Sequence, residues 1–262
     1  MTRVLSGAVL IVLAVALVWL ASPPVFFGVG VLVTIVASQE LIGLARAGGL
    51  GVPRFLSRLA AVLTMAVASL PAPPWALTVT LLAAFLALAF VTLGSWRGEP
   101  DALATVSASL LPSIYIGLPI ATLVAIRVNG GPAALSLLVS TIVVSDSAQY
   151  YSGRAFGRRP LAPAISPKKT VEGAAGGFVF GALALALAGH WWLPDVPVAM
   201  RALVGVGVVA LGIAGDLFES MLKRSAGVKD SSSLIPGHGG ILDRIDALLF
   251  AAPVYYIVLK YV

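Results

Sequence analysis

The sequence predicts an all-α, polytopic integral membrane protein with about nine transmembrane helices. Apolar side chains make up 59% of the 262 residues and charged side chains only 11%. The mean hydropathy of +1.02 lies far above that of a soluble globular domain. A helix needs about 20 apolar residues to cross the hydrocarbon core of a bilayer. Nine stretches reach or approach that length, at residues 4–21, 24–45, 56–71, 74–94, 103–126, 132–152, 173–192, 198–219 and 241–261.

Three of these stretches need separate justification. The first could be a secretory signal peptide, but Trp19 lies three residues before the Ala21/Ser22 junction, where cleavage requires a small residue. We therefore expect a helix there. The third stretch is short, and the fifth contains Pro112 and Pro119, which a membrane helix can accommodate as kinks.

The lysines and arginines predict the orientation of the chain in the membrane. With nine crossings, all 17 of them except Arg127, Arg201 and Lys260 fall on one side. By the positive-inside rule this places the N-terminus and the polar loops 153–172 and 220–242 in the cytoplasm. The net charge of +6 then reflects membrane topology, and no nucleic-acid partner is expected. Cysteine is absent, which excludes disulfides and thiolate chemistry.

The polar residues divide the chain into two regions. Residues 1–131 carry few polar side chains within their helices apart from Gln39 and Glu40, and we interpret this region as a transmembrane scaffold. Residues 132–262 contain most of the acidic residues that lie in or beside predicted helices. Because ionisable groups at membrane depth are costly, they are functional candidates. This second region is the predicted catalytic region.

Carboxylates near two helix ends predict a metal site. Asp216, Glu219 and Lys223 share one helix face, and Asp243 and Asp246 share another. Oxygen ligands without cysteine favour Mg²⁺, so Asp216, Asp243 and Asp246 are the candidate ligands. In the alternative, structural interpretation, these carboxylates form buried salt bridges with Arg224, Lys229 and Arg244.

Two polar segments have the composition of phosphate-binding loops. Gly239 and Gly240 precede the ninth helix, where backbone amides can bind an anion. His238 beside them could contact a ligand or only stabilise the turn. In the other loop, Lys168 and Lys169 precede Thr170, a natural N-cap. Adhesion to the membrane surface is the alternative, and we favour it for Arg158 and Arg159.

These residues together resemble the signature of the phosphatidate cytidylyltransferases, also called CDP-diacylglycerol synthases. The matching pattern is Ser220-x-Leu222-Lys223-Arg224, then Lys229-Asp230, then Pro236-x-His238-Gly239-Gly240-x-x-Asp243-Arg244-x-Asp246. It extends upstream through Gly215-Asp216-x-x-Glu219-Ser220, Ser166-Pro167-Lys168-Lys169-Thr170-x-Glu172-Gly173 and the region of Asp146. One departure is the segment Asp146-Ser147-Ala148-Gln149-Tyr150, where the family usually has an Asp-Thr-x-Ala-Tyr type of sequence.

The resemblance implies a reaction and roles for the site residues. CTP and phosphatidate would give CDP-diacylglycerol and pyrophosphate with Mg²⁺ as cofactor, in phospholipid biosynthesis at a bacterial inner membrane. A homodimer is implied as well. The catalytic residues would be Asp216, Asp243, Asp246, Lys223 and Arg224. The substrate-binding residues would be Asp146, Ser166, Lys168, Lys169, Thr170, Glu172, Glu219, Lys229, Asp230, His238, Gly239, Gly240 and Arg244.

Two other functional classes remain open at this stage. A related membrane enzyme that uses CTP, such as a polyprenol kinase or a synthase acting on another lipid phosphate, would share the nucleotide site. A transporter is the alternative outside the enzymes, because interrupted polar helices also build ion sites. No inverted repeat is evident in the sequence, which makes this class the weakest of the three.

Overall fold

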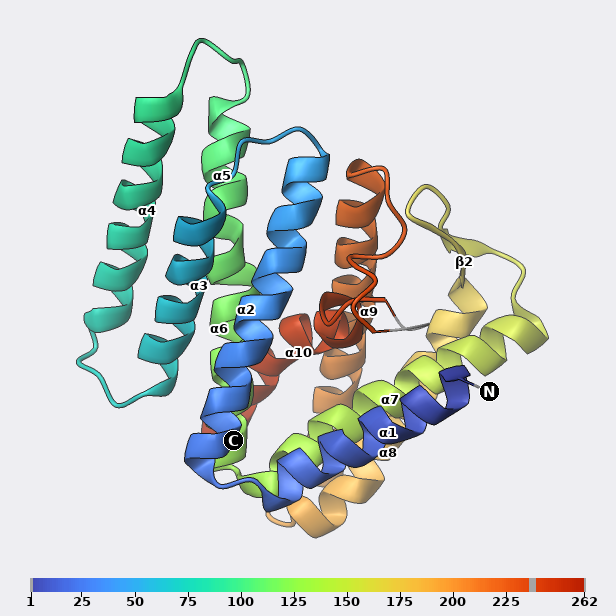
Figure 1. Ribbon diagram of the computed structural model, residues 1–262. Coiled ribbons are helices and arrows are strands. Elements are labelled where there is room, and N and C mark those ends of the chain that lie inside the picture. Colours follow the sequence, from blue (N-terminus) through green and yellow to red (C-terminus); the bar gives the residue numbers. More distant parts are fainter. Residues whose placement is uncertain (1, 236–238, 262) are drawn as a thin grey trace. The chain divides into compact units, whose positions relative to one another are not determined.

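The computed structural model describes residues 2–235 and 239–261 and is helical, as predicted (Figure 1). Its helices are α1 (Thr2–Leu20), α2 (Pro23–Ala47), α3 (Arg54–Ser69), α4 (Ala76–Ser95), α5 (Ala102–Pro112), α6 (Leu118–Asn129), α7 (Gly131–Phe156), α8 (Val171–Trp192), α9 (Val198–Ser225) and α10 (Leu242–Tyr261). A π-helical segment, η1 (Ser113–Gly117), joins α5 to α6. In the described part of the chain, each of the nine predicted stretches therefore corresponds to one helical rod.

Six of these rods are long and apolar enough to cross a membrane, which confirms a polytopic membrane protein. They are α2, α4, the rod from Ala102 to Asn129, α7, α8 and α9. The 16 residues of α3 span only about 24 Å at 1.5 Å per residue, less than the core of about 30 Å. Helix α10 carries Asp243, Arg244 and Asp246 near its start, and in α1 the apolar stretch of described side chains is Ile11–Leu20, which is shorter than a full crossing. Membrane crossing by α1, α3 and α10 stays a prediction.

The two prolines of the fifth stretch are accommodated by η1, which lies between them. Pro119 has no N–H group, so the carbonyl of Tyr115 loses its normal helical donor. A wider π-type turn lets the helix continue past this position. The predicted accommodation of both prolines within one rod is thus confirmed.

The chain separates into two compact units. Unit 1 comprises Met1–Val124 and Leu222–Arg244. Within it, α3 packs against α2, α4, α5 and η1 (Figure 1), burying Ala61 and Met65 completely. Gly117 of η1 lies so close to α3 that an added Cβ would be 2.7 Å from the carbonyl oxygen of Ala61.

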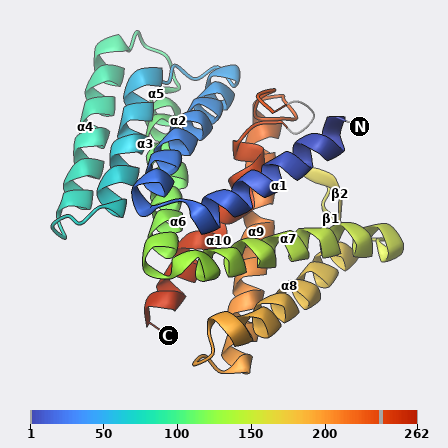
Figure 2. The same ribbon diagram turned by 60° about the horizontal axis from the view of Figure 1, so that its bottom comes forward.

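Unit 2 comprises Ala125–Met221 and Ile245–Val262. Here α7 and α8 lie side by side along their length (Figures 1 and 2). Glycines of α8 make this close approach possible. An added Cβ would lie 2.8 Å from the Gln149 carbonyl oxygen at Gly173 and 2.5 Å from Gln149 Cγ at Gly177. Gln149 and its neighbours on α7 are thereby held against the start of α8.

The predicted loop 153–172 contains a hairpin that the sequence did not indicate. Strand β1 (Pro160–Ala162) pairs antiparallel with β2 (Ser166–Thr170), with Pro160 opposite Thr170 and Ala162 opposite Ser166. Helix α7 continues to Phe156 and α8 begins at Val171, so both helices are longer than predicted. The hairpin holds Lys168 and Lys169 on a strand instead of in a mobile loop.

The two compact units do not coincide with the predicted scaffold, residues 1–131, and the predicted catalytic region, residues 132–262. The segment Leu222–Arg244, which contains much of the signature pattern, packs in the same unit as the N-terminal helices. Because the predicted division concerns function, it stays a prediction.

The orientation can be tested with single cysteines in this cysteine-free chain. We place them at Ser233 and Asp195, which are both exposed. The positive-inside rule predicts that Ser233→Cys reacts with a membrane-impermeant maleimide only after the membrane is opened. Asp195→Cys should react in intact cells. Labelling of both positions from the same side would contradict the predicted topology.

Candidate active site

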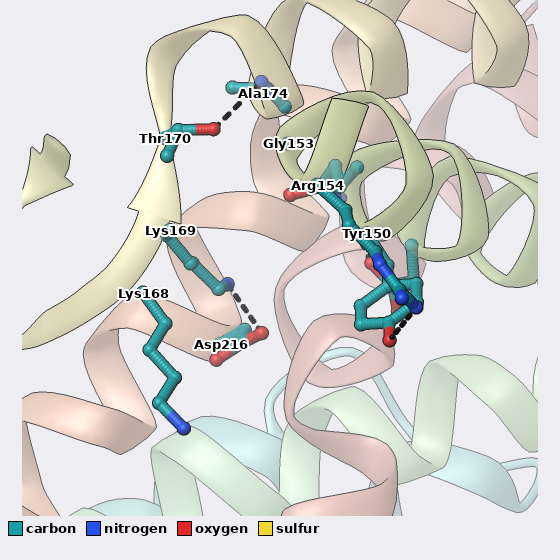
Figure 3. Close-up of a pocket in the computed structure, with 11 residues that line it drawn as sticks. Tyr150, Gly153, Arg154, Lys168, Lys169, Thr170, Ala174 and Asp216 are labelled. Atoms are coloured by element: carbon teal, nitrogen blue, oxygen red, sulfur yellow. Dashed lines mark hydrogen bonds and ion pairs between the residues drawn. The ribbon is translucent and has the colours of Figure 1, made fainter. Parts of the chain in front are cut away.

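A cavity of about 560 Å³ in unit 2 brings together predicted site residues from three helices and the hairpin (Figure 3). Its walls come from the second half of α7, from β2, from the start of α8 and from α9. The lining residues are Asp146, Gln149, Tyr150, Gly153, Arg154, Lys168, Lys169, Thr170, Gly173, Ala174 and Asp216. The cavity therefore combines cations, carboxylates and a helix N-terminus, which is the composition of a site for phosphorylated ligands.

The two lysines of β2 have different surroundings. Lys169 Nζ lies 2.5 Å from Asp216 Oδ2 and donates to it, and Ser220 Oγ donates to the other oxygen of Asp216 at 3.4 Å. Lys168 is exposed, and its side chain extends past this pair (Figure 3). Among the described residues its ammonium group has no ion-pair partner. Lys169 thus positions Asp216, while Lys168 is available for an anionic ligand.

Thr170 is the N-cap of α8, as predicted. Its Oγ1 accepts a hydrogen bond from the Gly173 amide at 3.1 Å. Thr170, Gly173 and Ala174 all line the cavity. The positive end of the α8 dipole therefore faces the same space as the lysines, and it favours negative charge there.

One face of α7 contributes residues that the sequence analysis did not select. Gln149 Nε2 donates to Asp146 Oδ1 at 3.0 Å, so the residue that departs from the family pattern orients the predicted Asp146. Arg154 donates to the Tyr150 hydroxyl at 3.5 Å. The helical spacing of Asp146, Gln149, Tyr150 and Arg154 places them on one face, and this spacing could have indicated the additional residues.

Glu172, predicted to bind substrate, supports the turn before the hairpin. It accepts hydrogen bonds from the backbone amides of Arg158 and Arg159 at 3.0 and 3.2 Å. It also forms an ion pair with Arg159 Nε at 2.9 Å. Arg159, for which we favoured membrane adhesion, therefore has a protein partner. Ser166, another predicted contact, is the first residue of β2.

In unit 1, Asp243 organises the segment that carries the signature pattern. Lys223 Nζ donates to Asp243 Oδ1 at 2.5 Å. The Ser231 amide and the Gly240 amide donate to Oδ2 at 3.1 and 2.7 Å. Ser231 Oγ also lies 2.7 Å from Oδ2. The Gly240 amide, predicted to bind a phosphate, is used within the protein in this structure.

Glu40 of α2 is a buried carboxylate that the sequence analysis assigned to the scaffold. Its side chain accepts hydrogen bonds from Ser232 Oγ and the Ile241 amide through Oε1, at 2.7 and 3.1 Å. Through Oε2 it accepts from the Leu242 amide at 2.8 Å and lies 3.1 Å from Ser231 Oγ. Glu40 therefore binds the N-terminus of α10 and the preceding serines to α2.

The other predicted residues occupy varied positions. Glu219 is fully buried in α9. Arg224 donates to the Val228 carbonyl at 3.0 Å and so stabilises the turn after α9. Lys229, Asp230 and Arg244 are exposed. Gly239 has a φ of +76°, a conformation that favours glycine, and His238 lies outside the described residues.

The three predicted metal ligands belong to different units. Asp216 and Asp246 lie in unit 2 and Asp243 in unit 1. At Gly215 the backbones of α9 and α10 approach so closely that an added Cβ would lie 2.5 Å from the Asp246 carbonyl oxygen. Among the described residues, no three acidic or histidine side chains cluster closely enough to hold a metal ion. The metal site stays a prediction.

The fold and this cavity define a polytopic membrane protein with a site suited to phosphate groups. Comparison with known proteins identifies its family: the chain belongs to the cytidylyltransferase family, whose model matches residues 1–262. The recognition made from the signature residues is thereby confirmed. The protein is accordingly a membrane enzyme of that family.

Similar proteins include several named phosphatidate cytidylyltransferase. The one from Aquifex aeolicus is 46% identical over 125 residues, 48% of this chain and 46% of its own length. The one from Pseudomonas aeruginosa is 39% identical over 168 residues, 63% of this chain and 59% of its own length. Uncharacterized protein YnbB of Escherichia coli is 39% identical over 135 residues, 52% of this chain and 45% of its own length. The matches thus span roughly half the length of these relatives.

The contacts of Glu40 predict that Glu40→Gln lowers stability and activity together. The amide nitrogen of Gln would face hydrogen donors on one side, so about two of the four contacts would be lost, at about 1–3 kcal/mol each. We expect a melting temperature in detergent lower by at least about 5 °C, and faster proteolysis within residues 226–241.

The matched control is Ser38→Ala on the same helix. Ser38 is fully buried, and its hydroxyl has no hydrogen-bond partner among the described residues. This variant should melt close to the wild type. Equal behaviour of the two variants would show that the Glu40 contacts do not hold the segment.

Proposed function

We propose that this protein transfers the cytidylyl group of CTP to phosphatidate, giving CDP-diacylglycerol and pyrophosphate. Family membership supports the use of CTP, and the relatives named phosphatidate cytidylyltransferase support the acceptor. The observation that carries the proposal is the cavity of unit 2, where Lys168, the N-terminus of α8 and Asp216 face one space.

The reaction needs no nucleophile from the protein. An oxygen of the phosphatidate phosphate attacks the α-phosphorus of CTP, a new P–O bond forms, and the bond to the β-phosphate breaks, so that pyrophosphate leaves. Catalysis then consists of positioning the two phosphates and neutralising their charge. Lys168 and Arg154 are the cations of the cavity best placed to bind the triphosphate, with the α8 dipole adding to their effect.

Two of the predicted carboxylates are fixed in position by lysines. Lys169 holds Asp216 in place, and Lys223 holds Asp243. We propose a cytoplasmic active site with access from the bilayer, because phosphatidate is a membrane lipid and CTP is a soluble nucleotide.

Mg²⁺ is the metal ion that we propose for this reaction. Asp216 and Asp146 line the cavity with hard carboxylate oxygens, the ligand type that Mg²⁺ prefers. We propose Asp216, Asp243 and Asp246 as its ligands. When bound, the ion would neutralise negative charge on the phosphates.

The purified protein should release pyrophosphate only when CTP, phosphatidate and Mg²⁺ are all present. Asp246→Asn keeps the side-chain volume but removes the anion, so activity should fall at least about 100-fold. The melting temperature should stay nearly unchanged, because a carboxylate that binds the metal is not needed for folding. If Asp246 instead formed a structural buried ion pair, its loss would destabilise the protein by about 3–5 kcal/mol.

Two comparisons make this assay decisive. Asp195→Asn, at an exposed position, is the control and should retain full turnover. Replacing phosphatidate with a polyprenol tests the alternative acceptor. A polyprenol kinase would transfer the γ-phosphate of CTP and release CDP instead of pyrophosphate, so this arm follows transfer of the label from γ-labelled CTP into the lipid. Greater activity with the polyprenol would refute the proposed substrate, and full turnover by Asp246→Asn would remove this residue from the metal site.

The unequal lysines of β2 lead to a separate prediction for CTP binding. Lys168→Ala removes a cation that has no protein partner among the described residues. We expect the KM for CTP to rise about tenfold, equivalent to about 1.4 kcal/mol, with the KM for phosphatidate and the melting temperature little changed. An equal rise in both KM values would contradict a role specific to CTP and reassign Lys168 to folding or to the lipid head group, and the melting temperature would distinguish these two roles.

A further inference from the structure

A buried arginine, Arg201, lies in the first turn of α9, 15 residues before Asp216 of the same helix. Arg201 is only 7% exposed. Its Nε and Nη1 atoms have no hydrogen-bond partner among the described residues. A cation in apolar surroundings is costly unless an anion or strong acceptors neutralise it. Arg201 therefore requires a partner that the described part of the protein does not supply.

Arg201 lines a cavity of about 50 Å³ in unit 2. One water needs only about 10–15 Å³ of such space, so the cavity is large enough for a small oxyanion group. Of the residues that line the cavity, Arg201 alone is charged, and most of the others are aliphatic, including Leu185, Val204 and Leu259. Tyr255 also lines it, but its hydroxyl donates to the Ala134 carbonyl at 3.1 Å.

The neighbouring helix is shaped to admit this side chain. An added Cβ at Gly189 of α8 would lie 2.8 Å from Arg201 Cδ, so the guanidinium can reach the cavity only because position 189 has no side chain. The position of Arg201 in the first turn of α9 also exposes any bound anion to the positive end of that helix dipole.

The cavity lies at the level expected for a membrane interface. Gly189 and Leu185 belong to the last turns of α8, at the opposite end of this helix from Thr170 and the candidate active site. Trp191 and Trp192 end the helix, and tryptophans concentrate where the hydrocarbon core meets the headgroups. Phosphate groups of lipids are found at this depth.

We propose that Arg201 and this cavity form a binding site for the phosphate group of an anionic phospholipid, on the membrane face opposite the active site. The guanidinium binds the phosphate oxygens in a charge-assisted pair. The aliphatic walls keep water away from this pair, and the glycerol and acyl chains of the lipid stay outside the cavity. This lipid is a bound structural ligand, separate from the lipid substrate, and the site does not depend on the proposed reaction.

The test compares the melting temperatures of lipid-free protein and of protein supplied with phosphatidylglycerol. Wild type should gain at least about 3 °C at saturating lipid, because a ligand that binds only the folded state stabilises it. Arg201→Met should show no gain. Without lipid, Arg201→Met should melt no lower than the wild type, because the substitution removes an uncompensated buried charge.

The control is Arg127→Gln, which alters the other arginine predicted on the same side and lies outside the cavity. It should keep the full lipid-dependent gain. An equal gain in Arg201→Met would place the lipid elsewhere and overturn the proposal. An equal gain with inorganic phosphate alone would identify a soluble anion as the ligand and overturn the lipid assignment. A lower melting temperature of lipid-free Arg201→Met would indicate a structural arginine.

Discussion

The Glu40 carboxylate, buried in an otherwise apolar helix, is the interaction on which the organisation of unit 1 depends. A carboxylate in such surroundings must be surrounded by donors. The Ser232 hydroxyl and the amides of Ile241 and Leu242 donate to it from a segment 191 to 202 residues later along the chain, and the Ser231 hydroxyl lies 3.1 Å from Oε2. The cost of burying Glu40 thereby selects one conformation for the serines before α10, because another conformation would leave the charge without partners. The helix that the sequence assigned to the scaffold thus shapes the segment that carries the family signature.

The paired charges separate residues that build the site from residues that are free to bind a ligand. Lys223 and Asp243 satisfy each other in unit 1, and Lys169 and Asp216 do so in unit 2. Asp216 and Asp243 thus form salt bridges, as the alternative interpretation of the carboxylates predicted. Their partners are Lys169 and Lys223, however, and not the predicted Arg224, Lys229 or Arg244. An ion pair does not exclude a catalytic role, because a lysine that holds a carboxylate also fixes its position for a ligand.

The sequence alone predicted the features that depend on hydropathy and on local residue preferences. Hydropathy located all nine helical rods, and the rule for N-caps located Thr170. One local feature and one set of distant contacts were missed. The hairpin of Pro160–Ala162 and Ser166–Thr170 has a short, proline-containing sequence without alternating hydrophobicity, so strand rules do not detect it. Glu40 was noticed, but its contacts were not predicted, since they come from donors 191 to 202 residues away. The face of α7 that adds Gln149 and Arg154 was within reach of helical periodicity alone.

Lys168 and Arg201 lie near opposite ends of α8, and we propose a different anionic ligand for each of them. Each is a cation without an ion-pair partner among the described residues. Lys168 is exposed in a cavity of about 560 Å³ that also contains carboxylates, where a large, hydrated nucleotide could enter and leave. Arg201 is buried in a cavity of about 50 Å³ with mainly aliphatic walls. A ligand there must bring its own apolar surface, because a hydrated anion would lose its water without compensation. Charge alone makes both positions candidate anion sites, and the volume and polarity of the surrounding walls are our grounds for proposing a nucleotide at one and a lipid at the other.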